Sequence, residues 1–431
     1  MTESIRSVAV IGGGTMGSGI AAASAAAGRR VLVLEDSPEA VEKARARVLA
    51  AARDEAERDA IAGLTEFATI AGGLPRLAEY DWVCEAIIED LAAKRRLFEA
   101  IERHRRPGSV VSTNTSGIPL AAITEGFPAT LRRDIAVTHF FNPVRVMRLL
   151  ELVPGADTRP EVLEALTAYG REALGKGVVR AKDTVNFIAN RIGCFWMLSG
   201  LHKAEAALAE GLRQEEVDAV LSAPVGLPAT GLYGLIDLIG LDVMDYVGVN
   251  LAANLPAGDP GHAYAAFPPA VRRLRERGQL GRKSGGGFTR VLKAADGSKV
   301  KEVFDLVADA WRPAVAVTIA ETDPLFADSA AGRLAWDVMG DTLFYAADLL
   351  PEIADDIVAV DRALRWGFNW QRGPFEFLDH LGPQRVIKRL HAEGRRLPRL
   401  LALLEQGGHA SFYRDGQFLG LDGRYHPVPA E

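Results

Sequence analysis

The chain has few cysteines, and their positions exclude two kinds of site. Only Cys84 and Cys194 occur among 431 residues, and each lies in an apolar segment without CxxC spacing. Neither a disulfide nor a thiolate metal site is therefore expected. Both thiols are predicted to be buried and reduced, and no metal is predicted.

Long hydrophobic runs and an excess of positive charge are also missing. No uninterrupted apolar run reaches the roughly 18 residues that a membrane span requires. The charged N-terminus leads directly into a β-rich segment, which leaves no room for a signal peptide. A formal net charge of −6 provides no basic field for nucleic acid or for an anionic membrane. We expect a cytoplasmic protein that binds neither.

A glycine-rich turn lies near the N-terminus, between a predicted strand at Val8–Ile11 and an alanine-rich helical run at Ser18–Ala27. In the order strand, GxGxxG, helix, the first glycine permits a tight turn and the second lets the backbone approach a pyrophosphate. The third glycine lets the helix pack on the strand, and the helix N-terminus attracts negative charge. The turn predicts a dinucleotide cofactor bound by Gly12, Gly14, Thr15, Met16 and Gly17.

An acidic residue ends the next predicted strand. Val31–Leu34 is followed by Glu35, about 20 residues past the turn, where a carboxylate binds the adenosine ribose hydroxyls. A 2′-phosphate would be repelled there, so the predicted cofactor is NAD. The alternative is a flexible loop followed by a solvated acidic strand end.

Short β-rich segments alternate with helices up to about residue 180. The strands predicted after Glu35 are Phe67–Ile70, Asp81–Ile87, Val110–Thr113, Ile135–His139 and Leu149–Val153. This alternation indicates a doubly wound α/β sheet. From near Lys182 helix follows helix, beginning with Phe187–Leu208 and Gln214–Leu221, so a domain boundary is predicted near residue 180.

Two segments of the helical part have similar sequences. Val217-Asp218 is followed by Gly231, Asp237 and Gly240, and Val360-Asp361 is followed at nearly the same spacing by Gly373, Asp379 and Gly382. The segments GLYGLIDLIG and GPFEFLDHLG align. We interpret this as a duplicated helical domain, the alternative being chance similarity between amphipathic helices.

Three polar residues lie at or near the later strands, beyond whose carboxyl ends an open α/β sheet binds its ligands. Ser116 follows one strand, His139 ends another, and Glu151 lies within the next strand, twelve positions after His139. A histidine can take an alcohol proton near neutral pH, a carboxylate can fix its tautomer, and a serine hydroxyl can hold the substrate oxygen. From position alone, His139 could equally be a packed core residue and Glu151 a surface charge.

The motifs around these residues resemble the L-3-hydroxyacyl-CoA dehydrogenase family. They are NTS ending at Ser116, HFFNP from His139, ELV from Glu151, and KDT-x-x-FIANR ending at Arg191. The resemblance implies oxidation of a 3-hydroxyacyl-CoA by NAD in fatty-acid β-oxidation. It implies that His139 is the general base, Glu151 its partner acid, and Ser116 and Asn190 the substrate hydrogen-bonding residues.

The resemblance also implies further cofactor-site residues, namely Ser116, Glu89, Lys94, Asn142 and Lys283. Glu89 and Lys94 could instead be a simple i,i+5 pair at a loop–helix junction. One departure from the family's pattern is Val185-Asn186 after KDT, where the family often has proline, so a less rigid entry to the next helix is expected.

The implied organisation is an α/β Rossmann-type sheet followed by two all-α domains in tandem, as in the dehydrogenase portion of multifunctional β-oxidation proteins. We predict a NAD-binding domain at 1–181, a helical domain at 182–290, a linker at 291–328 and a degenerate second helical repeat at 329–431. An enoyl-CoA hydratase or a thiolase is a candidate partner. The chain is expected to be a monomer in which the second repeat supplies a pairing contact within the chain, or else a homodimer. The alternatives left open are a dehydrogenase of a CoA-free hydroxy acid and a non-catalytic NAD-binding module.

Overall fold

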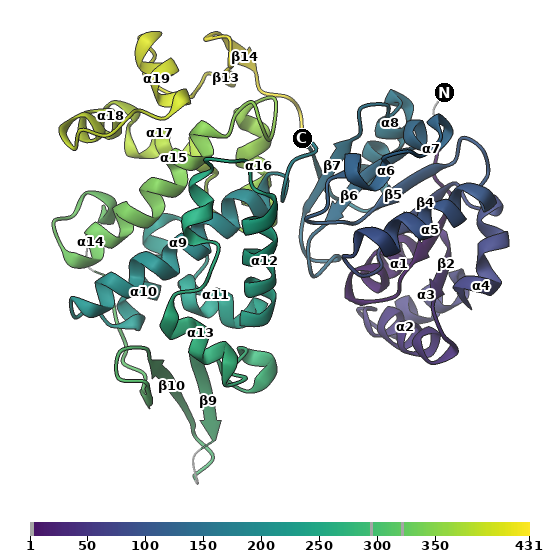
Figure 1. The fold of residues 1–431 in the computed structure, drawn as a ribbon, viewed down its shortest axis with the longest axis horizontal. Helices are drawn as coiled ribbons and strands as arrows, with labels where there is room; N and C mark the ends of the chain where they lie inside the picture. The colour runs from purple at the N-terminus through teal and green to yellow at the C-terminus, as the bar shows by residue number, and fades with distance from the viewer. Residues whose placement is uncertain (1–3, 294–295, 320–322) are drawn as a thin grey trace. The chain divides into compact units, whose positions relative to one another are not determined.

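Residues 4–293, 296–319 and 323–431 are described in a computed structural model of the chain (Figure 1). They form two compact units, each with its own internal contacts. The first unit runs to Ile188 and also contains Pro351–Gly367 and Pro429–Glu431. The second unit contains Ala189–Leu350 and Phe368–Val428.

The first unit is built on an eight-stranded sheet in the order β3-β2-β1-β4-β5-β6-β7-β8. Neighbouring strands are parallel except β6 and β7, which are antiparallel. The strands are β1 (Ser7–Ile11), β2 (Arg30–Glu35), β3 (Thr65–Thr69), β4 (Trp82–Glu85), β5 (Val110–Thr113), β6 (Ile135–Phe140), β7 (Leu149–Pro154) and β8 (Gly177–Arg180). This is the predicted Rossmann-type sheet, and the ends of the predicted strands agree with it within two residues.

Helices connect these strands. They are α1 (Thr15–Ala26), α2 (Pro38–Ala50), α3 (Glu55–Leu64), α4 (Ile70–Gly73), α5 (Leu91–His104), α6 (Leu120–Thr124), α7 (Ala129–Asp134) and α8 (Pro160–Ala168). Ser37, Asp54 and Asp90 each accept a hydrogen bond from a backbone N–H three residues on, at the start of α2, α3 and α5. Such caps stabilise a helix by about 1 kcal/mol and fix where it begins.

A helix from far along the chain completes the first unit. Helix α16 (Ile357–Gly367) packs on β7 and β8. Its Trp366 covers Gly177, where an added Cβ would lie 2.3 Å from the indole ring, and Arg148 stacks on the same ring at 4.4 Å. A segment expected within the second helical repeat is thus part of the unit that carries the sheet.

The second unit is mainly helical. Its helices are α9 (Ala189–Ala209), α10 (Gln214–Val220), α11 (Gly231–Ile239), α12 (Leu241–Asn254), α13 (Pro269–Glu276), α14 (Ala330–Ala335), α15 (Asp341–Asp348), α17 (Pro374–Leu381), α18 (Pro383–Ala392) and α19 (Arg399–Gln406). A buried Arg191 on α9 donates to the Tyr345 hydroxyl of α15 at 2.5 Å and to Asp259 at 2.6 Å. This cluster joins the N-terminal and C-terminal helices of the unit.

The two segments with similar sequences also have similar local structure. In α11, Asp237 accepts hydrogen bonds from the backbone N–H groups of Phe288 and Thr289, both at 2.8 Å. In α17, Asp379 accepts from Phe412 and Tyr413 at 2.7 and 2.8 Å. Corresponding ring pairs, Tyr233–Phe288 and Phe375–Phe412, lie 4.7 and 5.1 Å apart. These matched contacts support a duplication.

The second unit is not wholly α-helical, which corrects the expectation of two all-α domains. Two antiparallel sheets of three strands occur in it. One, β9 (Thr289–Lys293), β10 (Lys299–Asp305) and β11 (Ala310–Pro313), occupies much of the predicted linker, and the other is β12 (Tyr413–Arg414), β13 (Gln417–Leu419) and β14 (Tyr425–Pro427). Backbone pairing in these segments satisfies polar groups that a helix would satisfy internally.

Candidate active site

The glycine turn after β1 has the geometry that a dinucleotide requires. Gly12 has a φ of +97°, which favours glycine. A Cβ on Gly17 would lie 1.7 Å from the Gly12 carbonyl oxygen, so only glycine allows this approach of α1 to the turn. At Gly14 an added Cβ would meet no protein atom within 4 Å, so packing within the protein does not require glycine there, whereas close approach of a ligand does.

The N-terminus of α1 is open to an anion. Its first turn contains no acidic residue, and no side chain caps it. The backbone N–H groups of this turn, with the positive end of the helix dipole, therefore suit a phosphate. The residues of the turn fit the predicted dinucleotide.

Glu35 lies at the carboxyl end of β2, as predicted. Its Oε1 accepts a hydrogen bond from the Gly13 N–H at 2.7 Å, which ties the strand end to the glycine turn. Arg47 of α2 donates to the Gly13 carbonyl at 3.3 Å. Glu35 therefore stands beside the turn, where an adenosine ribose would lie.

His139 and Glu151 form a buried pair at the end of β6. They are opposite each other in the antiparallel β6–β7 register, and His139 Nδ1 lies 2.7 Å from Glu151 Oε2. The residues are 4% and 0% exposed. Glu151 Oε1 also accepts the Ile188 N–H at 3.1 Å. Within the described part of the chain, His139 Nε2 has no hydrogen-bond partner, so a proton on Nδ1 leaves Nε2 as a base.

Two aromatic rings pack against the His139 ring. Phe141 packs edge-on against it with a centroid distance of 4.6 Å, and Phe187 packs at 5.5 Å. Core packing and pairing with a carboxylate therefore coexist at His139. Glu151 is not the surface charge that its position alone allowed.

The turn that carries Ser116 is held by Glu89. Its Oε1 accepts hydrogen bonds from the Thr115 hydroxyl at 2.6 Å and from the N–H groups of Ser116 and Gly117, both at 2.9 Å. Burial would raise the pKa of Glu89, but Lys94 and these three donors keep that pKa below its ordinary value. Glu89 is thus ionised and orders the Ser116 turn.

Lys94 is enclosed by two carboxylates. It is 1% exposed, and its Nζ lies 3.2 Å from Glu89 Oε2 and 2.8 Å from Glu85 Oε1. The i,i+5 pair is therefore present. Glu85 was not predicted as a site residue, although it ends β4 at the same edge of the sheet as Ser116 and His139.

The remaining predicted residues belong to different parts of the molecule. Asn142, joined to Pro143 by a cis peptide bond, is exposed after β6 in the first unit. Asn190, the second residue of α9, and Lys283 belong to the second unit. Lys283 lies in a 3₁₀ turn at Arg282–Ser284 and forms an ion pair with Asp242.

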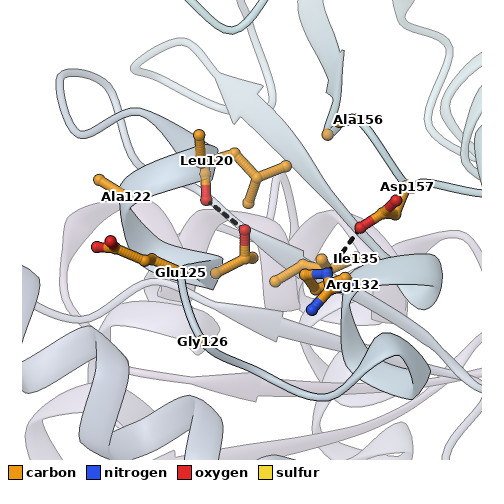
Figure 2. A pocket seen from close by; sticks show the side chains of 11 residues that line it. Leu120, Ala122, Glu125, Gly126, Arg132, Ile135, Ala156 and Asp157 are labelled. Atoms are coloured by element: carbon orange, nitrogen blue, oxygen red, sulfur yellow. Dashed lines mark hydrogen bonds and ion pairs between the residues drawn. The ribbon is translucent and has the colours of Figure 1, made fainter.

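A pocket of about 550 Å³ also lies in the first unit, away from this chemistry (Figure 2). It is lined by α6 and by residues at the start of β6, the end opposite His139. Its charged groups include Arg132 and Asp157, which pair with each other at 2.7 Å. We therefore place the candidate site at the carboxyl edge of the sheet and not in this pocket.

Both cysteines are free and buried, as predicted. Burial raises the pKa of each thiol to about 12. Among the described residues, no cluster of histidine, cysteine and acidic side chains is arranged to hold a metal ion. None of the described helices has the length and hydropathy of a membrane span.

Two family models match consecutive parts of the chain. Residues 7–184 match the NAD binding domain of 3-hydroxyacyl-CoA dehydrogenase, and residues 187–291 match its C-terminal domain. A 3-hydroxybutyryl-CoA dehydrogenase of Mycobacterium tuberculosis is 34% identical, over 67% of this chain and 99% of its own length. The chain belongs to the 3-hydroxyacyl-CoA dehydrogenase family. Members of this family are NAD-dependent oxidoreductases, and NAD is the cofactor of the matched domain.

Two further relatives extend beyond residue 291. A probable 3-hydroxyacyl-CoA dehydrogenase of Bacillus subtilis is 34% identical over 96% of this chain but only 56% of its own length. The crystal structure of a 3-hydroxybutyryl-CoA dehydrogenase from Escherichia coli matches 94% of this chain and all of that chain, with 27% identity and a TM-score of 0.72. The chain thus spans little more than half of the Bacillus relative.

Proposed function

We propose that the chain oxidises an L-3-hydroxyacyl-CoA to a 3-oxoacyl-CoA with NAD. The observation that carries this proposal is the buried His139–Glu151 pair, on the same edge of the sheet as the glycine turn. Strands β1, β4, β5 and β6 are parallel, so the residues that follow them share one edge. A base and a dinucleotide site on one edge suit the oxidation of an alcohol.

In this reaction Glu151 keeps the proton of His139 on Nδ1, and Nε2 takes the proton of the substrate hydroxyl. NAD supplies the acceptor for the hydride from C3. Ser116 hydrogen-bonds the substrate oxygen from a turn that Glu89 holds. General-base assistance of this kind contributes roughly 10²- to 10⁴-fold in rate.

The other predicted roles rest on the resemblance to the family. Glu35 is proposed to bind the adenosine ribose, after exchanging its hydrogen bond to Gly13. Asn142 and Lys283 are proposed cofactor residues and Asn190 a substrate residue, each on the evidence of its motif.

The biological setting is proposed from the names of the relatives. Oxidation of 3-hydroxyacyl-CoA is a step of fatty-acid β-oxidation, so an enoyl-CoA hydratase and a thiolase are the candidate partners before and after it. Because the chain spans only 56% of the Bacillus relative, such activities could belong to another region of a longer protein or to a separate one. We propose the cytoplasm as the compartment.

The domain organisation is proposed to be a tandem repeat of the helical C-terminal domain. The matched contacts of Asp237 and Asp379 support it. The Arg191–Tyr345 hydrogen bond and the stacking of Phe195 on Tyr345 at 4.1 Å join the two copies. If the second copy supplies within one chain the contact that a partner's helical domain would otherwise make, the chain is a monomer, and a homodimer is the alternative.

The proposal is tested by following NADH absorbance with acetoacetyl-CoA and, in parallel, NAD reduction with free hydroxy acids. Turnover of the CoA thioester alone supports it. Turnover of free acids alone indicates a CoA-free dehydrogenase, and NAD binding without turnover of either indicates a non-catalytic module. His139→Gln is expected to lose most turnover while NAD still binds, and comparable turnover in this variant contradicts the assignment of His139.

A further inference from the structure

The segment Thr115–Ala121, called here the serine segment because it contains Ser116, is held in place largely by side chains. It follows β5 and leads into α6. Apart from Pro119, which has no N–H, each of its backbone N–H groups has a side-chain acceptor. Thr115 donates to Thr113, Ser116 and Gly117 to Glu89, Ile118 to the Thr115 hydroxyl, and Leu120 and Ala121 to Asp183. These acceptors therefore set the position of the Ser116 backbone.

Asp183 comes from a distant part of the sequence, 63 residues after Leu120. Its Oδ1 accepts the Leu120 N–H at 2.7 Å, and its Oδ2 accepts the Ala121 N–H at 2.8 Å. These are the first two residues of α6, and the first N–H groups of a helix have no acceptor within it. The residue before α6 is Pro119, whose side chain has no acceptor. Asp183 thus takes the place of a local helix cap.

The part of the chain that carries Asp183 also reaches the catalytic pair. Ile188, five residues further on, donates its N–H to Glu151 Oε1 at 3.1 Å. Between these two contacts the Phe187 N–H donates to the Thr184 carbonyl at 3.2 Å, so the connection is a hydrogen-bonded turn. One short stretch of backbone therefore contacts the serine segment at one end and the carboxylate partner of the base at the other.

We infer that Asp183 is a positioning residue, which fixes the serine segment relative to the His139–Glu151 pair. Both of its oxygens accept from the backbone of α6, so it acts through the serine segment and not on the substrate. The inference rests on the proposed function, in which Ser116 hydrogen-bonds the substrate oxygen whose proton His139 takes. Both side chains must meet the same oxygen, and a displacement of about 1 Å can lower a rate by roughly 10²-fold.

The test is a double-mutant cycle of Asp183→Ala and Ser116→Ala, with kcat/KM for acetoacetyl-CoA measured at saturating NADH. With Ser116 present, Asp183→Ala is expected to lower kcat/KM about tenfold. In the Ser116→Ala background it should lower kcat/KM less than about twofold, because no hydroxyl remains to be misplaced. Asp183→Asn keeps one of the two acceptors and should lower kcat/KM about threefold. An equal loss in both backgrounds would overturn the inference.

A matched control separates positioning from general destabilisation. Asp134 is also in the first unit and pairs with the buried Arg105 at 2.8 Å, but it lies before the start of β6, at the end opposite His139. Asp134→Ala should lower the melting temperature at least as much as Asp183→Ala does, with kcat/KM within about twofold of the unsubstituted protein. A loss of kcat/KM as large as that in Asp183→Ala would attribute the effect to destabilisation and contradict the inference.

Amide hydrogen exchange tests the inference without turnover. If the unsubstituted protein does not turn over acetoacetyl-CoA, the proposed function fails, and exchange still measures what Asp183 holds. In Asp183→Ala the N–H groups of the serine segment should exchange at least about tenfold faster, while those of β5 keep their rates. If that variant does not fold, Asp183→Asn should give the same pattern with a smaller change. Unchanged exchange in the serine segment contradicts the inference.

Discussion

His139 and Glu151 are directly opposite each other in the only antiparallel pair of the described eight-stranded sheet, and 2.7 Å separates Nδ1 from Oε2. Their spacing of twelve residues is therefore set by the connection between β6 and β7. Side chains opposite each other in such a pair lie on the same face of the sheet. The backbone register brings the histidine and carboxylate together before any ligand binds.

Replacement of Glu151 by glutamine should impair the rate far more than it impairs binding. The Ile188 N–H, 3.1 Å from Oε1, requires an acceptor, so the amide oxygen of Glu151→Gln faces Ile188 and its NH₂ group faces His139. Nδ1 must then accept a hydrogen bond, which moves the ring proton to Nε2 and removes the base. We expect kcat to fall roughly 10²- to 10⁴-fold, with the Kd of NAD within about threefold.

The comparison that isolates this effect is the double variant His139→Gln, Glu151→Gln. Residues that act as one unit are not additive, so the double variant should have nearly the same kcat as His139→Gln alone. A further large loss of rate in the double variant would show that Glu151 acts independently of His139.

Position alone left the pairing of His139 with Glu151 open, and the resemblance to the family implied it; the two side chains do lie together. Local patterns in the sequence predicted the glycine turn and the place of Glu35 at a strand end, because each depends on residues near in the chain. The five strands predicted after Glu35 were found for the same reason, but β8 was missed. It is four residues long, as β4 and β5 are, but it begins with Gly177 and ends with the exposed Arg180, so its sequence favours a strand less strongly.

Features that depend on distant contacts were not predictable in this way. Glu85 has the sequence context of an apolar strand, and only the fold places Lys94 and Thr113 against its carboxylate. Helix α16 has an ordinary amphipathic sequence. That pattern does not predict that Trp366 packs on Gly177, in a strand almost 200 residues earlier in the chain.

The entry to α9 depends on a left-handed backbone at Asn186. Asn186 and Phe187 have φ values of +59° and +51°. The segment at Val185-Asn186, where we expected a less rigid entry to the helix, therefore forms a defined turn just before Ile188, whose N–H binds Glu151. Asparagine tolerates this conformation and a β-branched residue does not. Asn186→Val should lower the free energy of unfolding by about 2 kcal/mol or more, whereas Asn186→Gly should change it by less than about 1 kcal/mol.

Urea denaturation of both variants checks this, and kcat provides a second measurement. Since the turn presents the Ile188 N–H to Glu151, Asn186→Val should also reduce turnover at temperatures where it stays folded. Equal stability of the valine and glycine variants would show that the left-handed turn is not required.

Two half-buried carboxylates should make the second unit less stable at pH 7.5 than at pH 5. Burial raises the pKa of Asp218 to about 7 and that of Asp379 to about 6, although backbone N–H groups donate to both. Their pKa values in the unfolded chain are near 3.9, so the folded state binds more protons between pH 4 and pH 7 and stability falls as the pH rises through that range. Glu215 has its pKa lowered to about 2, against about 4.3 in the unfolded chain. Its opposite contribution is therefore gained mostly below pH 5, and it offsets little of the difference between pH 5 and pH 7.5.

Calorimetric unfolding at the two pH values measures this difference, for which we expect about 2 to 3 kcal/mol from Asp218. Asp218→Asn removes the titrating group and keeps an oxygen that can accept the Tyr233 N–H, now 2.6 Å from Asp218 Oδ1. The variant should therefore lose part of the pH dependence without a comparable loss of stability at pH 7.5. An unchanged difference between pH 5 and pH 7.5 in this variant would show that Asp218 is ionised throughout, and that its two backbone donors outweigh its burial.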